Sequence, residues 1–589
     1  MESKKTNYSA LTILVTVFFF WGFIAAGNSI FIPFCKVYFD LDQFQSLLID
    51  FAFYFAYYIG ALFLFVMGTM KGSDPVGKWG YKNSIVYGLV FSALGAAAMI
   101  FSVYNNVFVG MLFGLFIVAL GFSLQQTAAN PFMISLGDET TGSNRISLGG
   151  GINSLGTTIA PLVVGLILFG SAQVTDEMKD GLSMEKVVYL YAFVGLLFLG
   201  IAALFAFSKK LPSGKLEDPE IAKKEGSENL LDVAIDNKKS AAKLEKANKA
   251  LASLLVITGL LIICFVPVFG SYRSTEALKI TEYQLELKQL KEIGAPAIEK
   301  EVLEAQVEYL RIPLEQRRLL WLTAGLIVVI GGIVFSYFKA QKKPEGWGAM
   351  RYPQLVLGML AIFIYVGVEV TIGSNLGELL SDMDYSSAEI APFIALFWGS
   401  LMIGRWASAI HVFEMSNLVK NILTTVVPLV AFALVLIFSM LAGHDVQQLY
   451  LYVYCVIVLI VGFYLSKNKP ALTLLLFSLL GVLSTLVGIY GTGMIAIYGF
   501  ISAGLFCSIM WPCIFSLSLA GLGKYKTQGS AFLIMMILGG AIIPPLQGKL
   551  MDLMSVQSSF VVGTVCFIYL AFFAYYVGRR LKKQGVSLD

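Results

Sequence analysis

Runs of about twenty mostly apolar residues recur along the whole chain, and a helix of that length spans the hydrocarbon core of a membrane. Six runs fall near 11–33, 46–69, 83–103, 108–135, 146–170 and 188–208. The others fall near 250–270, 319–338, 353–374, 388–412, 419–442, 448–466, 471–489, 492–518, 530–550 and 559–578. The pattern therefore predicts an all-α polytopic membrane protein with about sixteen transmembrane helices.

Two longer stretches between these runs are polar. The segment 209–249 is rich in lysine and poor in apolar residues, which favours a cytoplasmic linker. The segment 271–318 has helical periodicity on both sides of Gly294-Ala295-Pro296, and this predicts a helical hairpin outside the membrane.

Basic residues fall in alternate loops. If the N-terminus is cytoplasmic, the alternation of spans places most of the basic loop residues on the cytoplasmic side. These are Lys71, Lys78, Lys82, Arg145, the lysines of the 209–249 linker, Lys339, Lys342, Lys343, Arg351, Lys467, Lys469, Lys524, Lys526, Arg579, Arg580, Lys582 and Lys583. The opposite loops 375–387 and 443–447 contain no lysine or arginine. We therefore expect both termini in the cytoplasm.

Composition excludes several other classes. Of the residues, 57% are hydrophobic and 14% are charged, which is more apolar surface than the core of a soluble protein of this size could bury. The net charge is only +4 and the basic residues form no patch, so we expect no nucleic-acid partner. The six cysteines show no metal or haem spacing and are interpreted as small buried hydrophobes. No Walker motif, nucleophile elbow or HExxH occurs, so we expect neither an ATP-driven pump nor an enzyme, and no cofactor or metal.

Four amides interrupt two of the apolar runs. Gln125, Gln126 and Asn130 lie in the fourth run and Asn153 in the fifth. An unpaired amide in hydrocarbon costs several kcal/mol, so these side chains should face other helices or a wet cavity. Gln126 and Asn130 are four residues apart and share a helix face, which we interpret as one wall of a solute path.

The two halves of the chain resemble each other weakly. The segment 129–137, ANPFMISLG, has a counterpart in 510–517, MWPCIFSL. Each is followed by a short loop and a glycine-rich helix with proline toward its far end, Pro161 in one and Pro544-Pro545 in the other. Repeated halves with interrupted helices are typical of secondary transporters.

Six segments together resemble the fucose/glucose/galactose permease family of the major facilitator superfamily. They are WGFIAAGNSIFIPFCKVYFDL, LIDFAFYFAYYIG, QQTAANPFMISLG, NSLGTTIAP, MIGRW and SIMWPCIFSLSLAGLGKYKTQGSAFLIMMILGGAIIPPLQG, in this order along both halves. The resemblance implies a twelve-helix, alternating-access transporter of monosaccharides in a bacterial cytoplasmic membrane, which is typically proton-coupled.

The chain has about four more predicted spans than the twelve that this family implies. We expect a major-facilitator fold of two six-helix bundles with two inserted helix pairs, because insertion in pairs preserves the topology. The expected domains are an N-terminal bundle at 1–208, the linker at 209–249, an inserted pair with its extracytoplasmic hairpin at 250–352, and a C-terminal bundle at 353–589 with a second inserted pair within 419–489.

A second difference from the fucose/glucose/galactose permease family concerns the residues expected to couple transport to an ion. Ser29 and Gln126 occupy positions where the fucose permeases have acidic residues, so a proton site must lie elsewhere. Asp50 lies at a depth comparable to that of Ser29 and is one candidate, although it is also placed to reach interfacial water. Glu369 lies deep in the seventh core helix and is the other candidate. The alternative for Glu369 is a structural ion pair with Arg405, which is itself either a gate or a snorkelling residue at the cytoplasmic end.

The remaining candidates suit a sugar. Asn28, Gln126, Asn130 and Asn153 each offer a donor and an acceptor to hydroxyl pairs, although such amides also join membrane helices. Trp21 and Trp511 are placed to stack on a pyranose or simply to pack. His411 and His444 lie near helix ends, and neither is expected to be a ligand.

These observations predict a monosaccharide transporter that favours glucose or galactose over fucose and is coupled to H⁺ or Na⁺. Its partners would be the sugar and the lipid bilayer, and the sequence leaves the oligomeric state open. The alternatives are a facilitated-diffusion uniporter, and a sugar sensor or membrane interaction protein that has lost transport. A membrane enzyme is disfavoured because no catalytic constellation is present.

Overall fold

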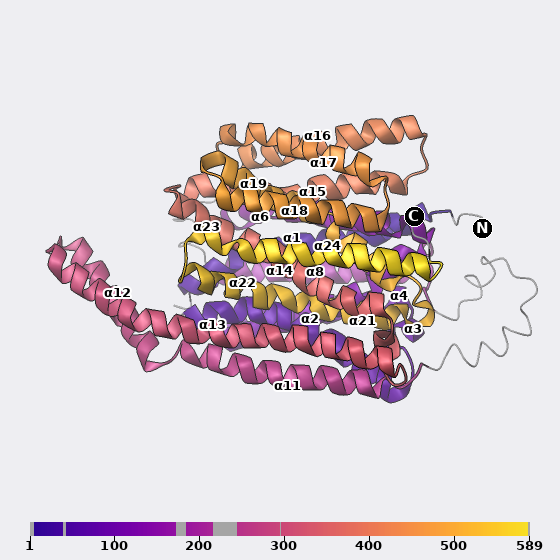
Figure 1. Ribbon diagram of the computed structural model, residues 1–589, viewed down its shortest axis with the longest axis horizontal. Helices are drawn as coiled ribbons and strands as arrows, with labels where there is room; N and C mark the ends of the chain where they lie inside the picture. Colours follow the sequence, from indigo (N-terminus) through magenta and orange to yellow (C-terminus); the bar gives the residue numbers. More distant parts are fainter. Residues whose placement is uncertain are drawn as a thin grey trace, which may run out of the picture.

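The computed structural model describes residues 5–38, 43–105, 107–171, 184–215, 244–294 and 296–586, and every regular element within them is a helix. Long helices lie side by side along the molecule (Figure 1). We call the end where the first helix begins and the last helix ends the terminal end. The opposite end, beyond which α12 projects, is called the hairpin end (Figure 1).

Six helices form the N-terminal half. They are α1 (Tyr8–Tyr38), α2 (Gln43–Lys71), α4 (Tyr81–Tyr104), α5 (Phe108–Ser135), α6 (Gly142–Phe169) and α8 (Met184–Phe207). Within this half α4 packs against α5 and α8, α1 packs against α6, and α2 packs against α5. The short helix α3 (Pro75–Trp79) joins α2 to α4.

The C-terminal half repeats this arrangement. It contains α14 (Pro353–Asp382), α15 (Ser387–Ala409), α18 (Pro470–Tyr490), α19 (Gly493–Cys507), α20 (Met510–Leu519), α21 (Lys526–Met535), α22 (Gly539–Met551) and α24 (Val561–Lys583). Helix α18 packs against α19 and α24 as α4 packs against α5 and α8, and α14 packs against α22 as α1 packs against α6. Between the halves, α2 meets α21 and α6 meets α15.

Four further long helices flank the halves. They are α11 (Asn248–Ser271), α13 (Ala297–Lys342), α16 (Asn417–Leu441) and α17 (Val453–Ser466). The first two lie at one edge of the bundle and the last two at the opposite edge (Figure 1). Fourteen helical segments of the described residues are long and apolar enough to cross a membrane, and α1 and α6, with 31 and 28 residues, are also of spanning length. The prediction of about sixteen spans is confirmed.

A helical hairpin projects beyond the hairpin end (Figure 1). It consists of α12 (Thr275–Glu292) and the first turns of α13. The sequence suggested a charged segment followed by a separate span, but α13 continues through Pro313 as one helix of 46 residues. At 1.5 Å per residue this helix is about 69 Å long, roughly twice the hydrocarbon thickness, so its first half extends past the membrane.

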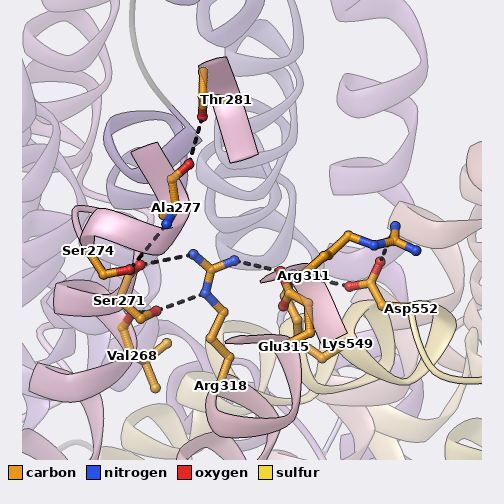
Figure 2. Close-up of polar contacts among 10 residues, drawn as sticks. All are labelled: Val268, Ser271, Ser274, Ala277, Thr281, Arg311, Glu315, Arg318, Lys549 and Asp552. Atoms are coloured by element: carbon orange, nitrogen blue, oxygen red, sulfur yellow. Dashed lines mark hydrogen bonds and ion pairs between the residues drawn. The ribbon is translucent and has the colours of Figure 1, made fainter. Parts of the chain in front are cut away.

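Buried charges fasten α13 to the C-terminal half (Figure 2). Glu315 of α13 accepts from Arg318 at 2.6 Å and pairs with Lys549 of α22 at 2.8 Å. Arg318 also donates from Nε to the Ser271 hydroxyl of α11 at 2.8 Å. Both Glu315 and Arg318 are buried. One network therefore joins α11, α13 and α22 where the hairpin leaves the bundle.

We expect Glu315→Gln to destabilise the protein by about 3 kcal/mol, because removing one partner of a buried ion pair leaves the others uncompensated. The measurement is thermal unfolding in detergent. Glu304→Gln is the control, since Glu304 forms an exposed pair with Lys291 and its loss should cost less than about 1 kcal/mol. Equal unfolding midpoints for the two variants would contradict a stabilising role for the network.

The two halves are joined at the terminal end. Asn144 of α6 donates to the Ser408 carbonyl at 2.9 Å, and the Tyr8 hydroxyl donates to the Val412 carbonyl at 3.1 Å. Glu139 forms an ion pair with Lys526 across the same boundary. These bonds hold the N-terminal and C-terminal halves together at the terminal end.

Candidate functional site

A cavity of about 980 Å³ lies between the two halves. It is lined by α1, α2, α5 and α6 on one side and by α14, α15, α16 and α20 on the other. Its lining reaches Ala391 near the start of α15 and His444 just beyond α16, so it extends toward the hairpin end. The volume is at the upper end of the range of small-molecule sites, which is roughly 300–1,000 Å³.

The predicted amide face lines this cavity. Gln126 and Asn130 reach it from α5 and Asn153 reaches it from α6. Gln126 donates to the Tyr57 hydroxyl at 3.2 Å, and Asn153 donates to the Phe18 carbonyl of α1 at 3.0 Å. Gln126 and Asn153 thus face the cavity while joining neighbouring helices, and their contact with a sugar stays a prediction.

Asn130 has an unsatisfied acceptor. Its amide nitrogen donates to the Gln126 carbonyl one turn earlier, at 3.0 Å, whereas its Oδ1 is buried and has no hydrogen-bond partner among the described residues. A buried acceptor of this kind costs free energy unless a ligand or a rearrangement supplies a donor. The position is consistent with a hydroxyl donor arriving in the cavity.

Pro131 explains a contact between the halves. Its ring has no N–H, so the Thr127 carbonyl four residues earlier lacks its helical donor. Ser530 of α21 donates to that carbonyl at 2.9 Å. The proline that interrupts α5 therefore exposes a carbonyl that the other half binds.

Two tryptophans line the cavity. The Trp21 indole donates to Gln125 Oε1 at 2.6 Å, and the Gln125 amide donates in turn to Ser92 at 3.1 Å. These bonds hold the Trp21 ring in place. Trp511 of α20 lies between Tyr365 and Phe515, with ring centroids 6.2 and 5.1 Å away.

Glu369 and Arg405 meet in the cavity wall. One oxygen of Glu369 lies 3.8 Å from Arg405 Nη2, and the same nitrogen donates to the Tyr365 hydroxyl at 3.3 Å. Arg405 Nη1 donates to Ser154 of α6 at 2.8 Å, and Nε donates to the Ser508 carbonyl at 3.2 Å. Arg405 therefore pairs with the carboxylate and bridges the two halves at once.

Glycines of α6 permit this bridge. The Trp406 indole donates to the Gly151 carbonyl at 3.1 Å, and a Cβ at Gly151 would lie only 2.6 Å from the Trp406 ring. A side chain there would push α15 away from α6. The glycine-rich run before Asn153 is thus needed for close contact between the halves.

Not every candidate can be placed. The side chains of Asn28 and Asp50 lie outside the described residues, so their roles stay predictions. Five cysteines of the described part are free, four of them buried. Among the described residues no group of three or more His, Cys, Asp or Glu side chains could hold a metal ion.

The sequence missed the contribution of α16. Phe438, Ser439 and Ala442 of this helix, and His444 after it, line the cavity. The sequence left open which two of the three runs between 419 and 489 form the second inserted pair, and His444 was interpreted as a residue of an outer loop. The one available signal was Ser439, a polar residue near the end of an apolar run.

Two repeated helical halves around a central cavity are an arrangement typical of the major facilitator fold. The fold agrees with the solved structure of the major facilitator superfamily transporter FucP in the outward conformation, with a TM-score of 0.56 and 19% identity over 96% of this chain and 98% of that one. No protein-family model matches the chain.

Several known proteins are similar in sequence. The glucose/galactose transporter of Brucella abortus is 28% identical over 576 residues, which cover 97% of this chain and 95% of the relative. A putative glucose/galactose transporter of Helicobacter pylori is 25% identical over 97% of both chains. The L-fucose-proton symporter of Escherichia coli is 36% identical over 177 residues, 30% of this chain and 38% of the symporter. Over nearly its whole length the chain is thus similar to proteins named glucose/galactose transporters, and over part of it to an L-fucose-proton symporter.

We expect Glu369 and Arg405 to be energetically coupled. In a double-mutant cycle of Glu369→Gln and Arg405→Met, followed by thermal unfolding in detergent, the coupling should be about 1–3 kcal/mol, because each single change leaves one buried charge unpaired. The effects of Arg405→Met and Glu304→Gln on the free energy of unfolding should instead be additive, because Glu304 lies in the distant hairpin. Additivity of the first pair would show that the 3.8 Å contact carries no energy.

Proposed function

We propose that the chain transports a neutral monosaccharide, glucose or galactose in preference to fucose, across a bacterial cytoplasmic membrane by alternating access. The observation that carries the proposal is the central cavity, which is lined by amides and aromatic rings and extends to one end, while the halves are joined at the other. The names of the full-length relatives support the choice of sugar.

The lining suits a polyhydroxylated, uncharged ligand. Gln126 and Asn153 can each exchange donors and acceptors with adjacent hydroxyls, and the free Oδ1 of Asn130 can accept from one. The fixed ring of Trp21 offers a face to the apolar side of a pyranose. Asn28 is proposed as a further sugar contact from the sequence alone, and Trp511 as a second stacking ring.

We further propose a core of twelve helices with two added pairs. Helix α18 takes the place in the C-terminal half that α4 takes in the N-terminal half, which leaves α16 and α17 as the pair within 419–489. The pair α11 and α13, with the hairpin, belongs to 250–352, and the segment 209–249 serves as the linker between 1–208 and the rest. The basic loops favour a cytoplasmic terminal end and an extracytoplasmic hairpin.

Ion coupling is proposed to run through Glu369, with Asp50 as the other candidate and H⁺ or Na⁺ as the ion. Glu369 is a carboxylate in the cavity wall, and neutralising it would weaken its attraction to Arg405, which bridges the halves. Facilitated diffusion is the alternative, because Ser29 and Gln126 replace the acids found in fucose permeases.

Gln126→Ala should raise the KM for counterflow of labelled glucose in proteoliposomes by about tenfold, since it removes a hydrogen-bonding pair from the cavity. Gln289→Ala in the exposed hairpin is the control and should leave KM unchanged. An unaltered KM in Gln126→Ala would remove this residue from the site. Absence of uptake of any hexose by the unmodified protein would favour the sensor.

Glu369→Gln should retain counterflow but lose both accumulation against a gradient and sugar-induced alkalinisation, because the amide cannot carry a proton. If the variant accumulates sugar like the unmodified protein, Glu369 is not the coupling group and Asp50→Asn becomes the next test. If the unmodified protein itself shows neither pH change nor accumulation, with or without a Na⁺ gradient, the chain is a uniporter.

A further inference from the structure

Helix α16 has two distinct faces near the hairpin end. Val435, Phe438, Ser439 and Ala442 recur at helical spacing and line the cavity. Between them, Ile437 and Met440 are 47% and 53% exposed on the outside of the bundle, where lipid would lie. At 1.5 Å per residue, the cavity face from Val435 to Ala442 extends about 10 Å along the helix axis.

The helix is held firmly against α15. A Cβ at Gly399 would lie 2.6 Å from Val435 Cγ2, so the absence of a side chain allows close contact. The Tyr452 hydroxyl, just before α17, lies 3.0 Å from the Ser400 hydroxyl, and its ring packs on Phe432. The cavity face of α16 is therefore a fixed part of the C-terminal half.

The end of α16 brings two polar groups together. Gly443 adopts φ +84°, and the backbone N–H groups of Gly443 and His444 donate to the carbonyls of Met440 and Ser439 at 2.9 and 3.1 Å. This is a Schellman motif, in which a left-handed glycine turns the chain back over the last helical turn. His444 is thereby held next to the turn that carries Ser439.

Both side chains are unengaged. Ser439 is only 4% exposed, and its hydroxyl forms no hydrogen bond within the described part of the chain, whereas the Thr424 hydroxyl of the same helix bonds the carbonyl four residues earlier. The His444 ring likewise forms no hydrogen bond to any described residue. Burial lowers the pKa of His444 below its ordinary value of 6.5, so near neutral pH the uncharged ring offers one donor and one acceptor.

We propose that Ser439, His444 and Phe438 form an outer binding subsite for a neutral hexose, which the sugar occupies before it reaches the amides of α5 and α6. The hydroxyl and imidazole bind sugar hydroxyls, and the Phe438 ring covers an apolar face of the pyranose. This inference rests on the proposed sugar transport. It gives α16, which lies outside the twelve-helix core, a direct part in substrate selection.

Ser439→Ala and His444→Ala should each raise the KM for hexose uptake by about threefold to tenfold, the effect of one lost hydrogen bond, with little change in maximal rate. Ile437→Ala and Met440→Ala, on the lipid face of the same helix, are matched controls and should keep the KM of the unmodified protein. Unchanged KM values in both cavity-face variants would overturn the subsite while leaving sugar transport intact.

A labelling experiment tests occupancy without relying on transport. Ser439→Cys should react with a membrane-impermeant thiol reagent above the background of the native cysteines, and excess glucose or galactose should slow the reaction at least threefold. Mannitol is the osmotic control, and Met440→Cys should show no protection. Failure of Ser439→Cys to be protected, in a variant that still takes up sugar, would overturn the proposal. Protection without uptake of any hexose would support the subsite and contradict the proposed transport.

Discussion

Polar groups within a membrane must find partners inside the protein, and the arrangement of both halves follows from that constraint. Pro131 and Pro512 each remove the N–H that would pair a carbonyl four residues earlier. In one half that carbonyl is bound by Ser530, and in the other by Arg405. Each proline thus replaces a bond within a helix by a bond between helices, and both bonds lie close to the cavity.

The flanking pairs meet the same constraint differently. Helix α13 carries Glu315 and Arg318 at the hairpin end, where Glu315 pairs with Arg318 and with Lys549 of α22, and α11 contributes the Ser271 hydroxyl as an acceptor for Arg318. Toward α2, by contrast, the described side chains of α11 offer the Thr258 hydroxyl, 2.7 Å from Tyr58, and aromatic contacts. Because the ion pair with α22 is the stronger contact, α11 and α13 should move with the C-terminal half if the two halves rock, while the contact between α11 and α2 changes.

Hydrophobic periodicity was sufficient to predict the spans, the hairpin and the cavity face of Gln126 and Asn130, because each depends on local spacing. Two features were not predictable in this way. The sequence suggested that the hairpin ends before a separate span at 319–338, whereas α13 packs on α12 and continues through Pro313 into that span as one helix. The cavity face of α16 depends on how closely α15 allows it to approach, which is decided by Gly399 outside the run, so that Ser439 was the one signal within the run itself.

Arg405 has unequal partners in the two halves, and this asymmetry bears on how the halves separate. On the N-terminal side it donates to neutral oxygens, the Ser154 hydroxyl and the Gly150 carbonyl at 3.5 Å. On its own side it faces the carboxylate of Glu369, whose opposite charge adds a Coulomb attraction that the neutral oxygens lack. Opening at the terminal end would therefore break the neutral bonds and leave Arg405 with Glu369. If an ion neutralises Glu369, as proposed for the coupling, that preference would weaken, and the charge state of one carboxylate would then alter the balance between the two conformations.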